Sequence, residues 1–186
     1  MKDLKSISKH ISCALRHTPE RYGLELDASG AVEVAKLLDA LRSLKPAWSD
    51  LDEAILLEIQ NSFDKKRFEI SEGKIRAYYG HSVRVESPVS PADPPAYLYH
   101  GTSENVLHLI KSAGISPMQR QHVHLSSDIE TAKNVANRKL GKTVILKIDT
   151  KKAACAGVKF YHGNQTTWLA DAIPWNVIAP DNDKLL

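Results

Sequence analysis

The sequence of 186 residues predicts an α+β protein made of two lobes. Apolar residues recur at helical spacing through residues 4–59, and two short strand patterns follow them. Beyond a proline-rich stretch, strand and helix patterns alternate. The chain is long enough for each lobe to enclose a hydrophobic core.

The first lobe, residues 1–86, begins with three amphipathic helices. Their apolar faces are Leu4, Ile7, Ile11 and Leu15, then Val34, Leu37, Leu38 and Leu41, then Leu51, Ile55, Leu56 and Ile59. Residues 67–70 and 75–78 form two strands around a glycine-bearing turn, the pattern of a β-hairpin. Three helices and a hairpin resemble a winged helix, a shape often used on nucleic acids, although a fold alone does not establish that use.

Residues 87–96 form a proline-rich linker, because proline fixes φ and disfavours helix before it. The second lobe, residues 97–186, is a mixed α/β lobe. Its strands are expected at residues 97–100, 122–125, 143–148, 159–162, 167–170 and 176–178, and its helices at 104–112 and from 128 to about 140. Ser127 is the expected N-cap of the later helix, and Gly114 and Gly141 are the expected helix ends.

The composition excludes some classes of function but does not identify one. The net charge of +3 is too small to indicate nucleic-acid binding without local patches. The basic runs at 65–67 and 151–152 are expected to be solvated faces. Cys13 and Cys155 show no CxxC spacing, which favours a reducing cytoplasm over a disulfide framework or a zinc site. Apolar runs of signal-peptide or transmembrane length are missing, so we expect a cytoplasmic monomer without a membrane partner.

Three stretches combine cations, imidazoles and hydroxyls with few carboxylates. They are Leu15-Arg16-His17, residues 75–82, and residues 99–102 together with 120–126. If the fold brings them together, they line a phosphate-binding pocket. Each has a plainer alternative. Arg16 and His17 can be a helix C-cap favoured by the helix dipole, and Gly80-His81-Ser82 an ordinary turn.

The segment His100-Gly101-Thr102 is expected to end a strand and open a helix, which would expose backbone N–H groups to an anion or a ribose. The alternative is a helix cap beside a packed histidine. His122 and His124 share one face of a strand, so a metal site is conceivable there. Zinc usually takes three or four ligands, and no cysteine or carboxylate cluster lies nearby in the sequence, so we expect no metal.

These segments resemble the RNA 2′-phosphotransferases of the KptA type, the tRNA 2′-phosphotransferase family. The similar stretches are residues 8–17 with 19–20, 64–68, 75–77, 80–82, 99–102, 120–126 and 168–169. The resemblance extends from about residue 4 to the end of the chain, with the motifs in family order. It implies a winged-helix-like first lobe and a second lobe of the ADP-ribosyltransferase fold.

The resemblance also implies NAD⁺ as co-substrate and a 2′-phosphorylated, tRNA-like RNA as partner. An internal 2′-phosphate would attack C1″ of the NAD⁺ ribose, expelling nicotinamide and giving a phospho-ADP-ribosylated RNA. The ribose O2″ would then attack phosphorus and release ADP-ribose 1″,2″-cyclic phosphate. By similarity, Arg16, His17 and Arg76 grip the phosphate and Arg120 bridges to the transferred group. The cofactor-binding residues by similarity are His100, Gly101, Thr102, His124 and Ser126.

The chemistry of the residues agrees with this reaction. A phosphate is already an anion near pH 7 and needs no general base, whereas arginines can orient it and neutralise charge. A glutamate beside it would repel it, and the sequence has no Glu-x-Glu pair. One departure from the family is Thr167 and a longer turn at 164–167. Two other functions remain open: capping of terminal phosphates by ADP-ribosylation, and RNA binding without catalysis.

Overall fold

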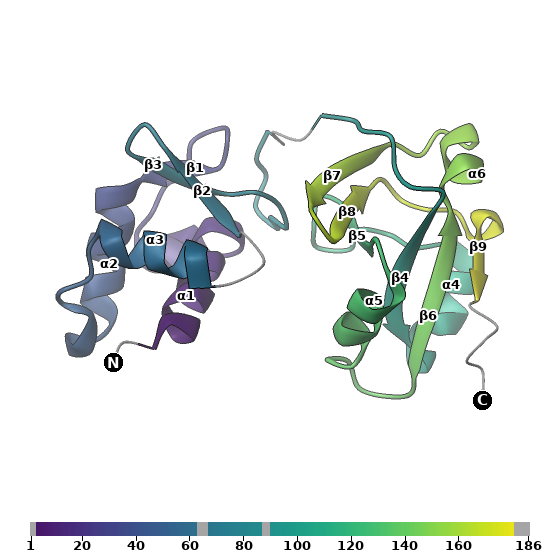
Figure 1. The fold of residues 1–186 in the computed structure, drawn as a ribbon, viewed down its shortest axis with the longest axis horizontal. Helices are drawn as coiled ribbons and strands as arrows, with labels where there is room; N and C mark the ends of the chain where they lie inside the picture. Colours follow the sequence, from purple (N-terminus) through teal and green to yellow (C-terminus); the bar gives the residue numbers. More distant parts are fainter. Residues whose placement is uncertain (1–2, 63–66, 87–89, 181–186) are drawn as a thin grey trace. The chain divides into compact units, whose positions relative to one another are not determined.

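The computed structural model describes residues 3–62, 67–86 and 90–180, which form a mixed α/β protein with two antiparallel sheets (Figure 1). The chain divides into two compact units, Met1–Pro88 and Val89–Leu186, called the first and second unit below. Lys65, Lys66 and linker residues 87–89 lie outside the described residues. Within the described ranges, none of the helices combines the length and apolar character needed to cross a membrane.

The first unit contains the three predicted helices. They are α1 (Leu4–Arg16), α2 (Val34–Leu44) and α3 (Glu53–Ser62), with short 3₁₀ turns at Pro19–Tyr22 and Pro46–Trp48. The apolar face of each helix is buried in one core, which confirms the spacing argument. Leu51 belongs to that core although it precedes α3.

A three-stranded antiparallel sheet completes the first unit, in the order β1-β3-β2. The predicted hairpin is confirmed as β2 (Phe68–Ser71) and β3 (Lys74–Ala77). The sequence analysis missed β1 (Ala31–Glu33), because three residues are too few to show a strand period. Alternation along β3 buries Ile75 and Ala77 against the helices and leaves Arg76 on the opposite face.

The second unit is built on a six-stranded antiparallel sheet of order β7-β8-β5-β4-β6-β9 (Figure 1). The strands are β4 (Tyr97–Ser103), β5 (Val123–Ser126), β6 (Thr143–Asp149), β7 (Phe160–Asn164), β8 (Thr167–Ala170) and β9 (Ile178–Pro180). The helices are α4 (Leu107–Ala113), α5 (Ile129–Ala136) and α6 (Thr150–Cys155), with 3₁₀ turns at Glu104–Val106 and Trp175–Val177. Of the expected linker, Ala92 donates its N–H to the carbonyl of Phe160 and packs on the second core.

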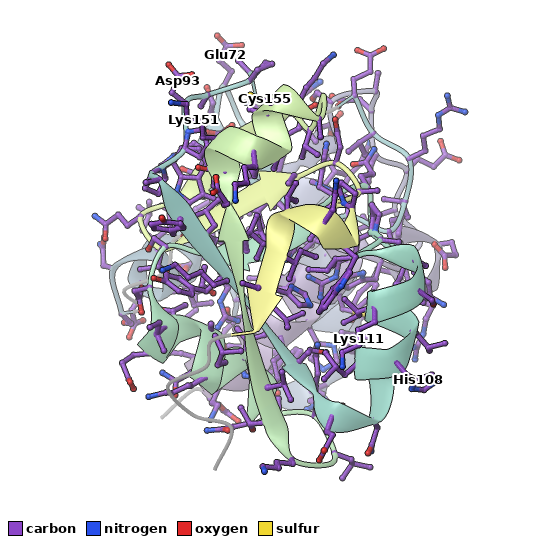
Figure 2. All side chains as sticks on the ribbon, turned by 90° about the vertical axis from the view of Figure 1, so that its right-hand side faces the viewer. Glu72, Asp93, His108, Lys111, Lys151 and Cys155 are labelled. Atoms are coloured by element: carbon purple, nitrogen blue, oxygen red, sulfur yellow. The ribbon has the colours of Figure 1, made fainter. Side chains whose placement is uncertain are left out.

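Several helix ends differ from the sequence prediction. The N-cap of α5 is Asp128 rather than Ser127, because the carboxylate of Asp128 accepts the N–H of Thr131 at 2.7 Å. The helix ends at Ala136, earlier than predicted. The sequence analysis missed α6, where the predicted solvated face at Lys151 and Lys152 is confirmed as exposed. Figure 2 shows Lys151 on α6, and Lys111 on α4, at the surface of the second unit.

Candidate functional site

In the first unit, the loop after β3 is tied to the end of α1. The carbonyl of Arg16 accepts hydrogen bonds from the backbone N–H groups of Ser82 and Val83, at 2.8 and 3.3 Å. The hydroxyl of Ser82 lies 3.1 Å from Nδ1 of His17. Two segments 65 positions apart in the sequence therefore present Arg16, His17 and Ser82 together.

The side chain of Arg16 reaches toward the β2–β3 hairpin. Its Nη2 donates to the carbonyl of Arg67 at 2.8 Å, and the same carbonyl accepts the N–H of Tyr78 at 3.3 Å. The guanidinium carbon lies 5.2 Å from the centre of the Tyr79 ring, a cation–π distance. His17 is the C-cap of α1 and Arg16 lies in its last turn, so the phosphate-site role of Arg16 stays a prediction.

Arg76 occupies the central strand of the same sheet and has a carboxylate beside it. Its Nε donates to Oε1 of Glu69, the residue directly opposite on β2. Glu69 was not among the site residues predicted from the sequence, where few carboxylates were expected. The strand register of a hairpin decides which side chains face each other, and the register depends on the position of the turn. The sequence analysis assigned no register to the hairpin and therefore missed the Glu69–Arg76 pair.

His81 is buried beneath the loop, only 3% exposed. Burial, and then the positive charges of Arg16 and His17, lower the pKa of His81 to about 4. A neutral imidazole is therefore expected at pH 7. Its Nε2 has no hydrogen-bond partner among the described residues. A Cβ on Gly30, whose φ is +77°, would come within 3.2 Å of Nε2, so glycine permits this close packing.

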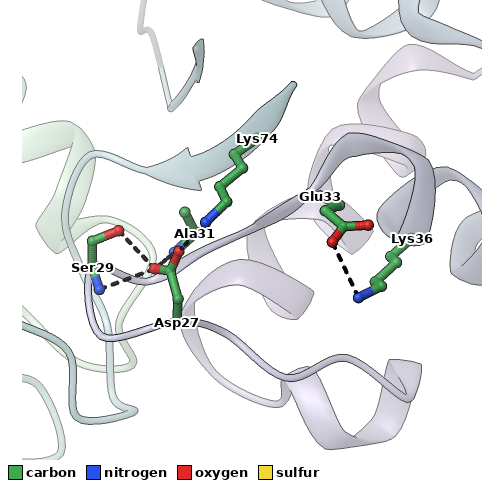
Figure 3. A network of polar contacts seen from close by, with 6 residues as sticks. All are labelled: Asp27, Ser29, Ala31, Glu33, Lys36 and Lys74. Atoms are coloured by element: carbon green, nitrogen blue, oxygen red, sulfur yellow. Dashed lines mark hydrogen bonds and ion pairs between the residues drawn. The ribbon is translucent and has the colours of Figure 1, made fainter. Parts of the chain in front are cut away.

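The turn that carries Gly30 is held by Asp27 (Figure 3). Its Oδ1 accepts hydrogen bonds from the backbone N–H groups of Ser29 and Ala31, both at 3.0 Å, and its Oδ2 pairs with Nζ of Lys74 at 2.9 Å. The hydrogen bond to Lys74, followed by those to Ser29 and Ala31, holds the pKa of Asp27 well below its usual range. These contacts hold the turn to Lys74 of β3, and the N–H of Glu86, in the segment after His81, donates to the carbonyl of Ala28 at 2.7 Å.

In the second unit, Arg120, His124 and His100 lie together. Nη1 of Arg120 is 2.5 Å from Nδ1 of His124. The same Nη1 lies 3.5 Å from Nε2 of the ring, and a guanidinium can only donate, so the imidazole is the acceptor. His100 lies on β4, and its Nδ1 donates to the carbonyl of His124 at 3.0 Å. Burial is the main cause that lowers the pKa of His100 to about 4, so this imidazole is neutral at pH 7.

Lys139 belongs to the same part of the second unit and was missed in the sequence. Its Nζ donates to the carbonyl of Gly101 at 2.9 Å, next to His100. Burial, and then the charge of Arg120, lower the pKa of Lys139. Two cations near one another favour an anion. The sequence carried no signal for Lys139, which follows α5 in a stretch typical of a solvated surface.

The expected strand-to-helix junction at His100-Gly101-Thr102 is wrong. These residues lie within β4, where Gly101 and Thr102 pair with Ile145 and Val144 of β6. A Cβ on Gly101 would come within 2.0 Å of the carbonyl oxygen of Ala132, so this glycine lets α5 pack on the sheet. Thr102 and Ser126 are buried hydroxyl residues. The cofactor roles of Gly101, Thr102 and Ser126 stay predictions.

The two histidines considered as a metal pair have different neighbours. The His122 ring packs 4.8 Å from the ring of Tyr161 on β7, whereas His124 contacts Arg120. Across residues 3–62, 67–86 and 90–180, no group of three or more His, Cys, Asp or Glu side chains is arranged to hold a metal ion.

Comparison with known proteins places these residues in a family. Residues 2–172 match the family model described as RNA 2′-phosphotransferase, Tpt1 / KptA family. A probable RNA 2′-phosphotransferase of Bacillus thuringiensis is 49% identical over 175 residues, covering 94% of this chain and 94% of that protein. A protein of the same name from Acetivibrio thermocellus is 46% identical over 172 residues, covering 92% and 94%. The chain therefore belongs to the RNA 2′-phosphotransferase family.

Proposed function

We propose that this protein is an NAD⁺-dependent RNA 2′-phosphotransferase that removes an internal 2′-phosphate from a tRNA-like RNA. Family membership and the presence of Arg16, His17, Arg76 and Arg120 support the proposal. The observation that carries it is the anchoring of Arg16. The carbonyl of Arg67 and the ring of Tyr79 orient its guanidinium, and an oriented guanidinium suits the bidentate binding of a phosphate.

The order of elements supports the finer architecture in the proposal. In the first unit, α1 and β1 precede α2 and α3, and the β2–β3 hairpin comes last, an arrangement that suits a winged-helix-like RNA-binding unit. The second unit, a six-stranded antiparallel sheet with helices beside it, would be the ADP-ribosyltransferase-like unit. We expect the protein to act as a cytoplasmic monomer without a metal.

In the first step, the side chains of the first unit would hold the attacking group. The 2′-phosphate is an anion at neutral pH, and Arg16, His17 and Arg76 would orient one of its oxygens and limit its freedom. NAD⁺ would supply the electrophilic C1″ of its ribose: the C–O bond to the phosphate would form as the C–N bond to nicotinamide breaks, and the ADP-ribosyl group would stay on the phosphate. The electron pair of the broken C–N bond leaves with nicotinamide, so this step needs no general base.

In the second step, ribose O2″ would attack phosphorus while the P–O bond to RNA O2′ breaks. The ribose O2″ would lose its proton and the leaving RNA O2′ would take one up, so the products are 2′-hydroxyl RNA and ADP-ribose 1″,2″-cyclic phosphate. Charge on the phosphoryl oxygens would be stabilised by arginines, Arg120 in particular. His100 and His124 would orient the NAD⁺ riboses. Imidazole nitrogens can accept or donate hydrogen bonds to hydroxyls, and the cations Arg120 and Lys139 suit an anionic dinucleotide.

The test mixes the purified protein with a short RNA that carries one internal 2′-phosphate, with and without NAD⁺. NAD⁺-dependent loss of the phosphate, with free nicotinamide and the cyclic phosphate, is the expected result. Nicotinamide release with stable ADP-ribosylated RNA would instead indicate capping of phosphates. RNA binding without nicotinamide release would overturn the enzyme proposal in favour of a binding module.

A further inference from the structure

Glu69 and Arg76 form a cross-strand pair on the outer face of the first unit's sheet. They are directly opposite in the β2–β3 register, and Oε1 of Glu69 accepts the hydrogen bond from Nε of Arg76. The side chains are 30% and 32% exposed. On the other side of Arg76, its partner on β1 is Ala31, whose methyl group cannot hold a guanidinium. Glu69 is therefore the cross-strand neighbour that can orient Arg76.

The geometry of the contact leaves the phosphate-binding end of Arg76 available. A guanidinium has five N–H donors, and Glu69 takes the one on Nε. The four N–H groups on the two Nη atoms form the fork that binds a phosphate in bidentate fashion. A contact at Nε fixes the rotation of this fork without occupying it.

The carboxylate of Glu69 is expected to weaken the binding of an anionic substrate, and the fold does not require the Glu69–Arg76 pair. A carboxylate next to a phosphate site lowers its attraction for an anion, and a partly exposed ion pair adds little to stability. Tyr78 follows β3, two positions after Arg76, and both charges of the pair act on its hydroxyl. Burial, and then the charge of Glu69, raise the pKa of this hydroxyl, whereas the charge of Arg76 lowers it. The carboxylate thus acts on the charge of this face as well as on the position of Arg76.

We propose that Glu69 is a positioning residue of the phosphotransferase: it orients the guanidinium of Arg76 through Nε, and its charge weakens the binding of phosphorylated RNA. The inference rests on the proposed function and assigns a role to a side chain that does not touch the phosphate. Orientation and charge make separate contributions, and two substitutions separate them. Glu69→Ala removes both, whereas Glu69→Gln keeps an amide oxygen that can still accept from Nε.

The experiment measures kcat and KM for 2′-phosphorylated RNA at saturating NAD⁺. Glu69→Ala is expected to lower kcat about tenfold, because a misplaced catalytic group slows a positioned reaction. Glu69→Gln is expected to recover most of that kcat and to lower KM for the RNA about threefold, since one negative charge is gone. A residue needed only for folding would lower Tm and the active fraction without lowering KM.

The matched control is Glu33→Ala, which removes another carboxylate of the same sheet. Glu33 pairs with Lys36 at 3.3 Å (Figure 3), and its cross-strand partner on β3 is Lys74 rather than Arg76. Its kcat and KM should equal those of the wild type. In an Arg76→Ala background, Glu69→Ala should have no further effect on kcat.

The outcomes separate the inference from the function beneath it. A wild-type protein that turns over, with Glu69→Ala as active as the control, would overturn the role of Glu69 and leave the proposed function intact. A wild-type protein without turnover would overturn both. If Glu69→Ala does not fold, the KM of Glu69→Gln decides: an unchanged or higher value contradicts the inference.

Discussion

The first and second units hold their arginines by different means. In the first unit, a backbone carbonyl and a tyrosine ring orient Arg16, and a cross-strand carboxylate orients Arg76. In the second unit, Arg120 contacts the imidazole of His124, which accepts a hydrogen bond only while Nδ1 carries no proton. The comparison teaches that the first unit sets the position of Arg76 through its strand register, whereas the second holds Arg120 by a side-chain contact with a residue four positions away.

The largest effect is expected from Arg16→Ala, which tests whether the first unit grips the phosphate. Loss of charge-assisted contacts worth about 3 kcal/mol should lower kcat/KM for 2′-phosphorylated RNA roughly 100-fold, with both steps damaged. Single-turnover assays that follow nicotinamide and RNA would measure each step. Lys36→Ala, which removes an exposed cation of the same unit, is the control and should behave as the wild type. Normal turnover of Arg16→Ala would contradict the assignment.

Arg120→Ala tests whether the second unit contributes at a different step. RNA binding should be largely kept while the second step slows by about 100-fold, since one charge-stabilising donor is lost. Phospho-ADP-ribosylated RNA should then accumulate and be visible by gel or mass spectrometry. The exposed Lys152 offers a control in Lys152→Ala. If Arg120→Ala instead loses RNA binding and forms no intermediate, its distinct role is wrong.

A pH dependence of stability is expected from His81 and His100, one in each unit. The folded-state pKa values of His81 and His100 are lowered to about 4, from 6.5. Each contributes stability that is present above pH 6.5 and lost as pH falls toward 4, because the unfolded chain then binds the extra proton. The loss per histidine is about 2 kcal/mol at pH 5.

Urea unfolding at pH 7 and pH 5 would measure this loss. His81→Leu should flatten the pH dependence of the first unit and leave that of the second unchanged. Equal pH dependence in the wild type and in His81→Leu would show that folding does not lower the pKa of His81, contrary to the prediction.

The smallest effect is expected at Tyr79, whose ring lies against Arg16. Tyr79→Leu should reduce kcat/KM roughly fivefold. This corresponds to about 1 kcal/mol, the size of an exposed cation–π contact. Tyr79→Phe keeps the aromatic face and should retain wild-type kcat/KM within about twofold. A loss in Tyr79→Phe as large as in Tyr79→Leu would show that the hydroxyl matters and not the ring.

The sequence by itself determined the parts of the fold that rest on local periodicity. The three helices of the first unit and its hairpin follow from the spacing of apolar residues and from the turn glycine, and both were predicted. The family and the segments that carry Arg16, Arg76 and Arg120 were also recognisable, because motifs in order do not need coordinates. The sequence analysis missed β1 and α6, because very short elements contain too few residues to show a period. It also placed the N-cap of α5 one residue too early.

Only the tertiary structure decided which side chains meet. Glu69 faces Arg76 because of the strand register. Gly101 lies inside β4, where the absence of a side chain makes room for α5. The turn at Gly30 packs against His81, whose imidazole is buried and has a lowered pKa. Lys139 donates a hydrogen bond to the carbonyl of Gly101, 38 positions away in the sequence. Such contacts depend on how distant segments fold onto one another, and local sequence patterns do not encode that arrangement.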